Sequence, residues 1–118
     1  MNVQVTHDGD GYYVLSCPNQ TQWPTQADLV GSVRAAAAGE VLRGLIIDLN
    51  GVSFMGSEGL GAIFALRRFA AEAGARVVVS RPTLTIARLL DTVNLPDLIP
   101  VTDTLEEARL ALGAAVPV

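Results

Sequence analysis

The stretch IIDLNGVSFMGSEGLG, residues 46–61, decides the fold class of this 118-residue chain. It begins within a short apolar run, Leu45–Leu49, that hardly alternates with polar residues. Such a run is typical of a strand that is buried on both faces of a parallel sheet. After a short connection, Ser57 opens a segment in which Leu60 and Ile63 follow at helical spacing. The stretch therefore predicts a strand, a tight loop and a helix.

The sequence on both sides continues this alternation. An N-terminal hairpin is predicted around a turn at Asp8–Gly11, and a second apolar run, Val77–Val79, follows the central helix. We expect Leu45–Ile47 and Val77–Val79 to form the centre of the sheet. The remaining predicted elements are a helix from about Gln26 to about Ala38 with Thr25 as its cap, a helix opened by Pro82, a short strand at Leu98–Val101 and a helix behind a capping box of Thr104 and Glu107.

Strands that alternate with helices after a hairpin predict an α/β fold. We expect a mixed, mostly parallel sheet with an N-terminal hairpin and about four helices packed on it. A chain of 118 residues fits one domain, so residues 1–118 should form a single unit, with about 113–118 as a frayed tail. We expect this unit to be a monomer or a weak dimer.

The charge balance disfavours several classes of partner. The net charge of −4 argues against a nucleic-acid surface, which needs a basic face, and against binding to anionic membranes. The longest apolar runs fall far below the roughly 20 residues needed to cross a bilayer. The polar, alternating N-terminus does not resemble a signal peptide. We therefore expect a cytoplasmic protein without nucleic-acid partners or membrane insertion.

The residues that most catalytic chemistries need are missing. The chain has eight arginines and no lysine, which excludes P-loop and Schiff-base chemistry. His7 is the single histidine, so a histidine-based metal cluster cannot form, and we expect His7 to be exposed on an edge strand. Cys17 has no nearby base and is expected to be a small apolar filler. We expect no catalytic residue, no metal and no cofactor, and hence a protein that is not an enzyme.

Ser57 is the residue best placed for a function. It lies among Gly56, Gly59 and Gly61, so its hydroxyl should be accessible. At a helix start this hydroxyl can cap a free N–H group, and capping is one explanation for a serine here. Gly59 and Gly61 each weaken the helix by up to roughly 1 kcal/mol relative to alanine. Such glycines favour close packing on the sheet or close approach by a partner.

This central stretch resembles the signature of the STAS family, the domain shared by anti-sigma factor antagonists and sulphate transporter tails. The family signature is a hydrophobic strand with Asp-Leu, a small apolar turn and then Asp-Ser-Ser/Thr-Gly-Leu-Gly. The similarity continues in Arg88–Leu95 and in Thr104–Leu110, and it covers residues 42–112 well. The matching residues of the central stretch are Asp48, Leu49, Val52, Phe54, Met55, Ser57, Gly59, Leu60 and Gly61.

The resemblance implies a regulatory role for Ser57. In the antagonists of this family, the first serine of the motif is the phosphoacceptor, and an anti-sigma factor with serine kinase activity phosphorylates it and thereby releases it. By position, the acceptor in this chain is Ser57. The resemblance also implies partner contacts near this serine and in the loop after the second strand, at Gly56, Glu58, Gly59, Leu60, Gln20 and Trp23.

Three features differ from the family pattern. Gly56 replaces the aspartate before the acceptor, and Glu58 replaces the second serine or threonine. The loop at residues 17–24 lacks the acidic residue of the family and is slightly longer. Trp23 in this loop is either a lid on the first helix or a contact residue. These differences suggest a divergent partner.

Two further hypotheses remain open. The domain could be a constitutive STAS scaffold, a subunit of a lipid-transport or stress-signalling complex that binds another STAS-binding protein without phosphorylation. It could also be an enzyme or a receiver-type domain of similar layout. A receiver needs an acidic pair after its first strand and a late lysine, and the sequence has neither.

Overall fold

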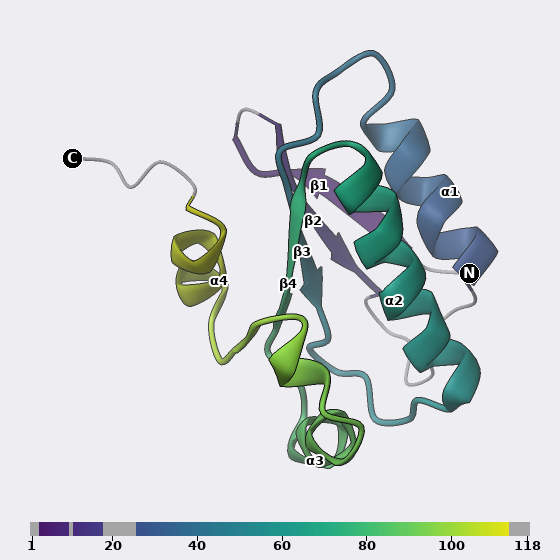
Figure 1. Cartoon of the computed structure of the whole chain (residues 1–118), viewed down its shortest axis with the longest axis vertical. Coiled ribbons are helices and arrows are strands. Elements are labelled where there is room, and N and C mark those ends of the chain that lie inside the picture. The colour runs from purple at the N-terminus through teal and green to yellow at the C-terminus, as the bar shows by residue number, and fades with distance from the viewer. Residues whose placement is uncertain (1–2, 10, 18–25, 114–118) are drawn as a thin grey trace.

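A five-stranded sheet runs through the described part of the molecule, with its strands in chain order (Figure 1). β1 (Gln4–His7) and β2 (Tyr12–Ser16) form an antiparallel hairpin. β3 (Gly44–Asp48), β4 (Arg76–Ser80) and β5 (Val101–Thr102) extend the sheet in parallel. The computed structural model describes residues 3–9, 11–17 and 26–113, and only the backbone of residues 26–28. The predicted α/β fold, with its hairpin and mostly parallel sheet, is confirmed.

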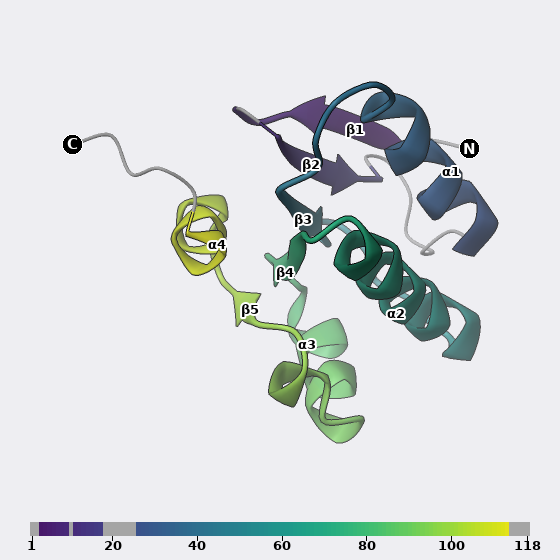
Figure 2. The ribbon, with the colours of Figure 1, turned by 45° about the horizontal axis from the view of Figure 1, so that its top comes forward.

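Helices cover both faces of this sheet (Figures 1 and 2). α1 (Gln26–Ala36) and α2 (Ser57–Glu72) pack against each other on one face. α4 (Leu105–Leu112) packs against β3, β4 and β5 on the other face, and α3 (Leu84–Thr92) lies near the carboxyl ends of the strands. No helix in the described residues is long and apolar enough to span a bilayer.

The core lies on the two sides of β3, which is buried along its whole length. Because side chains alternate along a strand, Leu45 and Ile47 enter the main core under α1 and α2, while Ile46 points to the opposite face. There it packs with Val78 of β4 and with α4. The residues predicted to form the sheet centre are therefore buried in β3 and β4, as expected.

Two predicted boundaries are wrong. The third helix begins at Leu84 instead of Pro82, because Thr83 is its cap and accepts a hydrogen bond from the N–H of Ile86. The predicted strand at Leu98–Val101 begins only at Val101, the first residue of the two-residue strand β5, because residues 98–100 form a turn and bend after a short 3-10 helix (η1, Leu95–Asp97). Asn94 precedes η1 in the left-handed region, at φ 58°, and turns the chain away from an extended path.

Other local predictions are confirmed. The hydroxyl of Thr104 accepts a hydrogen bond from the N–H of Glu107, whose carboxylate in turn accepts from the N–H of Asp103. This exchange of bonds fixes the start of α4. His7 is exposed on the edge strand β1. The predicted cap Thr25 and the turn residue Asp10 lie outside the described residues.

Candidate functional site

Ser57 is the first residue of α2, and its side chain is exposed. The helix cap is the preceding residue, Gly56, whose carbonyl accepts the first intrahelical hydrogen bond, from the N–H of Leu60 at 3.1 Å. Gly56 has no side chain and makes no capping bond. The predicted capping role of the Ser57 hydroxyl is therefore wrong, because the serine lies one residue inside the cap position.

The surroundings of the Ser57 hydroxyl suit an anion. Its oxygen forms no hydrogen bond with the described residues. The first N–H groups of a helix lack intrahelical partners, and the helix dipole places partial positive charge there. A negative group attached to Ser57 would consequently be stabilised at this position.

The loop that leads to Ser57 is held at the carboxyl end of β3. Asp48, the last residue of β3, is buried, with 7% of its side chain exposed. Its Oδ1 accepts hydrogen bonds from the Asn50 N–H and from Nε of Arg81, both at 3.1 Å, and its Oδ2 accepts from Nη2 of Arg81 at 2.5 Å. The two bonds from Arg81 join the ends of β3 and β4, and the bond from Asn50 starts the turn.

A second contact holds the middle of the same loop. The hydroxyl of Thr83 donates to the carbonyl of Val52 at 3.0 Å and at the same time caps α3. Val52 and Met55 of the loop are buried in the main core. The segment before Ser57 is thus held by the Arg81 bonds at the end of β4, by the Thr83 bond at the start of α3 and by packing in the main core. These contacts fix the position at which α2 begins. Sequence analysis identified Asp48 but not Arg81 or Thr83, because nothing local in the sequence pairs them with this loop.

The predicted contact residues around Ser57 differ in exposure. Glu58 is exposed in the first turn of α2, while Gly56 and Leu60 are half-buried. Gly59 is buried and faces the interior of the domain. The other two predicted contacts, Gln20 and Trp23, lie outside the described residues.

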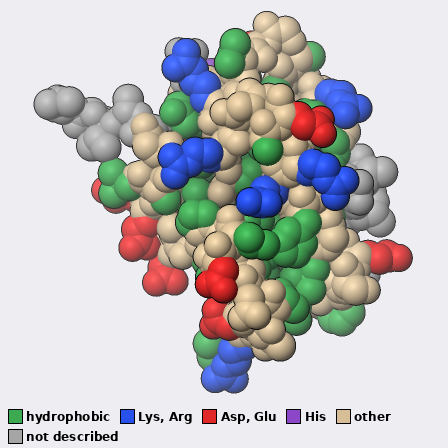
Figure 3. Space-filling view, in the orientation of Figure 1, with side chains coloured by type: hydrophobic (Ala, Val, Ile, Leu, Met, Phe, Trp, Pro, Cys, Tyr) green, Lys and Arg blue, Asp and Glu red, His purple; other side chains and the backbone are tan. Residues whose placement is uncertain are grey.

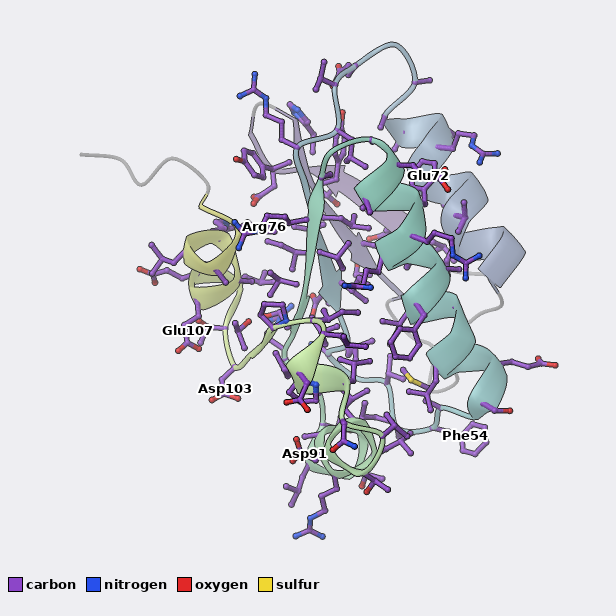
Figure 4. The ribbon with its side chains drawn as sticks, in the orientation of Figure 1. Phe54, Glu72, Arg76, Asp91, Asp103 and Glu107 are labelled. Carbon is purple, nitrogen blue, oxygen red and sulfur yellow. The ribbon has the colours of Figure 1, made fainter. Side chains whose placement is uncertain are left out.

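Two further residues lie on the exposed side of this site. Phe54, in the loop before α2, has 57% of its surface exposed, and its ring lies beside the start of α2 (Figure 4). Gly61 is exposed, and a Cβ built on it would meet no heavy atom within 4 Å. Close packing inside the domain therefore does not explain the glycine at 61. We call the exposed surface formed by Phe54, Ser57, Glu58 and Gly61 the α2 N-terminal face.

Cys17 has the environment of a structural residue. It is 2% exposed and belongs to the main core. Burial raises the pKa of its thiol to about 11, because the thiolate loses its hydration there. At neutral pH the group is thus a neutral thiol, which is a poor nucleophile.

We expect Cys17 to resist alkylation while the domain is folded. At pH 8, iodoacetamide should label it at least about 100-fold more slowly in native buffer than in urea, because only the exposed thiolate reacts. Mass spectrometry of quenched samples measures the two rates. Rapid labelling of the native domain would contradict the buried, neutral thiol described here.

Known proteins share the architecture of this chain. A family model described as the STAS domain matches residues 7–108. An anti-sigma factor antagonist from Mycobacterium paratuberculosis is 26% identical, with a TM-score of 0.70 over 95% of this chain and 93% of that one. The unphosphorylated form of the anti-sigma factor antagonist SpoIIAA is 17% identical, with a TM-score of 0.76 over 98% and 99% of the two chains.

A third solved structure agrees in fold. It is an anti-sigma-factor antagonist (STAS) domain protein from Planctomyces limnophilus, 22% identical, with a TM-score of 0.75 over 96% of this chain and 99% of that one. The family match covers most of the chain, and the sheet order and helix arrangement are shared with domains of nearly the same length. This chain is therefore a member of the STAS domain family.

Proposed function

We propose that this domain is a regulatory module of the anti-sigma factor antagonist type. Its α2 N-terminal face binds an anti-sigma factor with serine kinase activity, and phosphorylation of Ser57 weakens that complex. The domain acts by binding and carries no catalytic site of its own.

The position of Ser57 is the observation that carries this proposal. Its hydroxyl is exposed at the first position of a 16-residue helix and caps nothing, so helix capping does not account for the serine. A kinase can reach the hydroxyl, and the helix N-terminus can accept the phosphate without unfolding the domain. The similarity to antagonists, one of them described in an unphosphorylated form, supports the same reading.

Phe54 and Gly61 support protein binding at this face. Exposed aromatic side chains are frequent centres of binding energy in interfaces, and the ring of Phe54 lies close to the Ser57 end of α2. Gly61 lies one helical turn after Ser57, on the same side of α2, and lets another backbone approach closely. The face thus combines an apolar contact, an accessible hydroxyl and a flat helix surface.

Glu58 supports a second candidate function, the constitutive scaffold. It places a permanent carboxylate next to Ser57 in the first turn of α2, where the family pattern has an uncharged residue. A partner that accepts Glu58 already tolerates negative charge at this face. In that case the domain would bind its partner in a lipid-transport or stress-signalling complex without being phosphorylated.

A capture experiment separates the two functions. The wild-type domain, Ser57→Glu and Ser57→Ala are immobilised, and bound proteins from a lysate of the source cell are identified by mass spectrometry. We expect wild type and Ser57→Ala to capture the same anti-sigma factor, and Ser57→Glu to lose it. With ATP, the captured protein should add one phosphate to wild type and none to Ser57→Ala. Equal capture by all three baits without phosphate transfer would favour the scaffold.

We expect Gly61→Ala to stabilise the domain and to weaken partner binding. Alanine removes the helix penalty of glycine, which adds about 0.5–1 kcal/mol to the free energy of unfolding, and its Cβ would meet no heavy atom of another described segment within 4 Å. Urea denaturation measures the gain, and calorimetry with the captured partner measures the binding.

Gly31→Ala is the matched control for this prediction. Gly31 is exposed within α1, and a Cβ there also meets nothing within 4 Å. It should give a similar gain in stability but unchanged partner affinity. If Gly61→Ala binds the partner as tightly as Gly31→Ala does, Gly61 is not part of the interface.

A further inference from the structure

A groove on the opposite half of α2 is separate from the Ser57 site. It has a volume of about 670 Å³ and runs between the second half of α2, the edge of β4 and the end of α4. Arg67, the first of its arginines, follows Ser57 by ten residues on the same helix. At the rise of an α-helix this corresponds to roughly 15 Å along the axis. The groove therefore forms a second surface of the domain.

The floor of the groove is an unpaired part of the sheet edge. β5 pairs only with Val79 and Ser80, the last two residues of β4. The N–H of Arg76 faces β3 and donates to the Arg43 carbonyl. Because the backbone N–H groups of successive residues in a strand point to opposite sides, the N–H of Val77 points toward the groove. The next residue that faces this way, Val79, donates to the carbonyl of Pro100 at 2.9 Å.

Val77 lacks the corresponding partners. In the register of β4 and β5, its N–H would donate to Leu98 and its carbonyl would accept from Pro100. Leu98 has left the ladder with helical backbone angles, and Pro100 has no N–H to donate. Among the described residues, nothing hydrogen-bonds these two groups of Val77. An unpaired strand edge that lines an open groove favours the addition of another strand.

The walls of the groove are basic. Arg67 and Arg68 of α2 and Arg76 of β4 line it together with apolar residues such as Phe64. Figure 3 shows basic side chains on this face beside hydrophobic ones, whereas most acidic side chains lie toward its lower and left rim. Arg76 extends toward α4, where it donates a long hydrogen bond of 3.5 Å to the Ala111 carbonyl (Figure 4).

These three arginines have no acidic partner among the residues that the structure describes. In the described residues, Arg81 and Arg109 form ion pairs with Asp48 and Asp8, but no carboxylate pairs with Arg67, Arg68 or Arg76. Three of the eight arginines of a chain with a net charge of −4 thus converge on one groove. Their charges complement an acidic ligand.

We propose that this groove binds an extended, acidic segment of a partner protein, which adds to the edge of β4 as a strand. The backbone of the segment pairs with Val77. Its apolar side chains contact Phe64 and the neighbouring groove wall, and its carboxylates pair with Arg67, Arg68 and Arg76. Binding here does not involve Ser57, so it does not depend on the proposed function.

A labelled peptide of alternating glutamate and valine tests the proposal by fluorescence anisotropy with the full chain. We expect saturable binding that weakens with added salt, and no binding of the same peptide with lysine in place of glutamate. The double variant Arg67→Gln/Arg68→Gln should bind the acidic peptide roughly tenfold more weakly. Arg88→Gln is the matched control: Arg88 is exposed on α3, outside the groove, and its loss should change nothing.

Two separate measurements test whether the peptide backbone hydrogen-bonds to β4. A glutamate–valine peptide that is N-methylated on alternate residues keeps its charge but loses the N–H groups of one edge, and it should bind much more weakly. The Val77 amide should exchange hydrogen more slowly when the unmethylated peptide is bound. Ser57→Glu should bind the peptide like wild type.

Three results would overturn the proposal. The first is equal affinity for the methylated and the unmethylated peptide, which would show that the groove binds by charge alone and without backbone pairing. The second is an equal loss with Arg88→Gln, which would make the effect one of net charge. The third is an arginine-dependent dimer in light scattering without peptide, which would assign the groove to a second copy of the chain.

Discussion

Ser57→Glu should weaken binding of the anti-sigma factor by about 100-fold or more, which corresponds to roughly 3 kcal/mol. The new carboxylate projects from the α2 N-terminal face beside Glu58, so a partner surface complementary to an uncharged serine has to take up a second negative charge. The domain itself should remain as stable as wild type, since a helix N-terminus favours an anion by roughly 0.3–1 kcal/mol. Calorimetric titration and thermal melting measure the two effects separately.

Two variants serve as controls. Ser57→Ala should keep full partner affinity and lose less than about 0.5 kcal/mol of stability, because the hydroxyl forms no capping bond. Ala38→Glu adds the same charge at an exposed position just after α1, in the connection to the first residue of β3. This variant should leave the affinity for the partner unchanged. Equal partner affinity for wild type, Ser57→Glu and Ser57→Ala would reject the switch.

Arg81→Ala should have the largest effect on stability among changes near the site, with a loss of about 2–3 kcal/mol. It leaves the buried carboxylate of Asp48 with the Asn50 N–H as its remaining hydrogen-bond donor among the described residues. The figure lies below that for a fully buried pair because 39% of the Arg81 side chain is exposed. Arg81→Lys should recover part of the loss, since an ammonium group cannot reproduce the two-bond geometry. Urea denaturation measures all three proteins.

The pair formed by Arg109 and Asp8 is the matched control. It has the same two-bond geometry, at 2.8 and 3.0 Å, but 20% of the Asp8 side chain is exposed, against 7% for Asp48. Solvent screens this pair better, so Arg109→Ala should lose about 1 kcal/mol or less. In the double variant Asp48→Asn/Arg81→Ala, the loss should be smaller than in Arg81→Ala alone. Equal losses for Arg81→Ala and Arg109→Ala would show that burial of Asp48 does not matter.

The sequence predicted the order of strands and helices because that order depends on local patterns. The apolar runs in β3 and β4 lack polar alternation, and Ser57 begins the helical spacing of α2, so each element could be identified from its own residues. Predictions of helix caps were less accurate. Ser57 and Thr83 both lie at the start of a helical pattern. Only Thr83 is a cap, whereas Ser57 is already the first residue of its helix, because the backbone angles that define a cap are set by the preceding loop.

What the sequence by itself determined is the class of fold, the STAS resemblance and the exposed serine at the start of the central helix. What only the tertiary structure decided is how distant residues meet. Arg81 follows Asp48 by 33 residues, yet the parallel register of β3 and β4 brings their ends together. The groove of Arg67 and Arg76 likewise forms because β5 is too short to cover β4. Local spacing encodes periodicity within one element, whereas pairing between elements depends on register and packing, which no single segment contains.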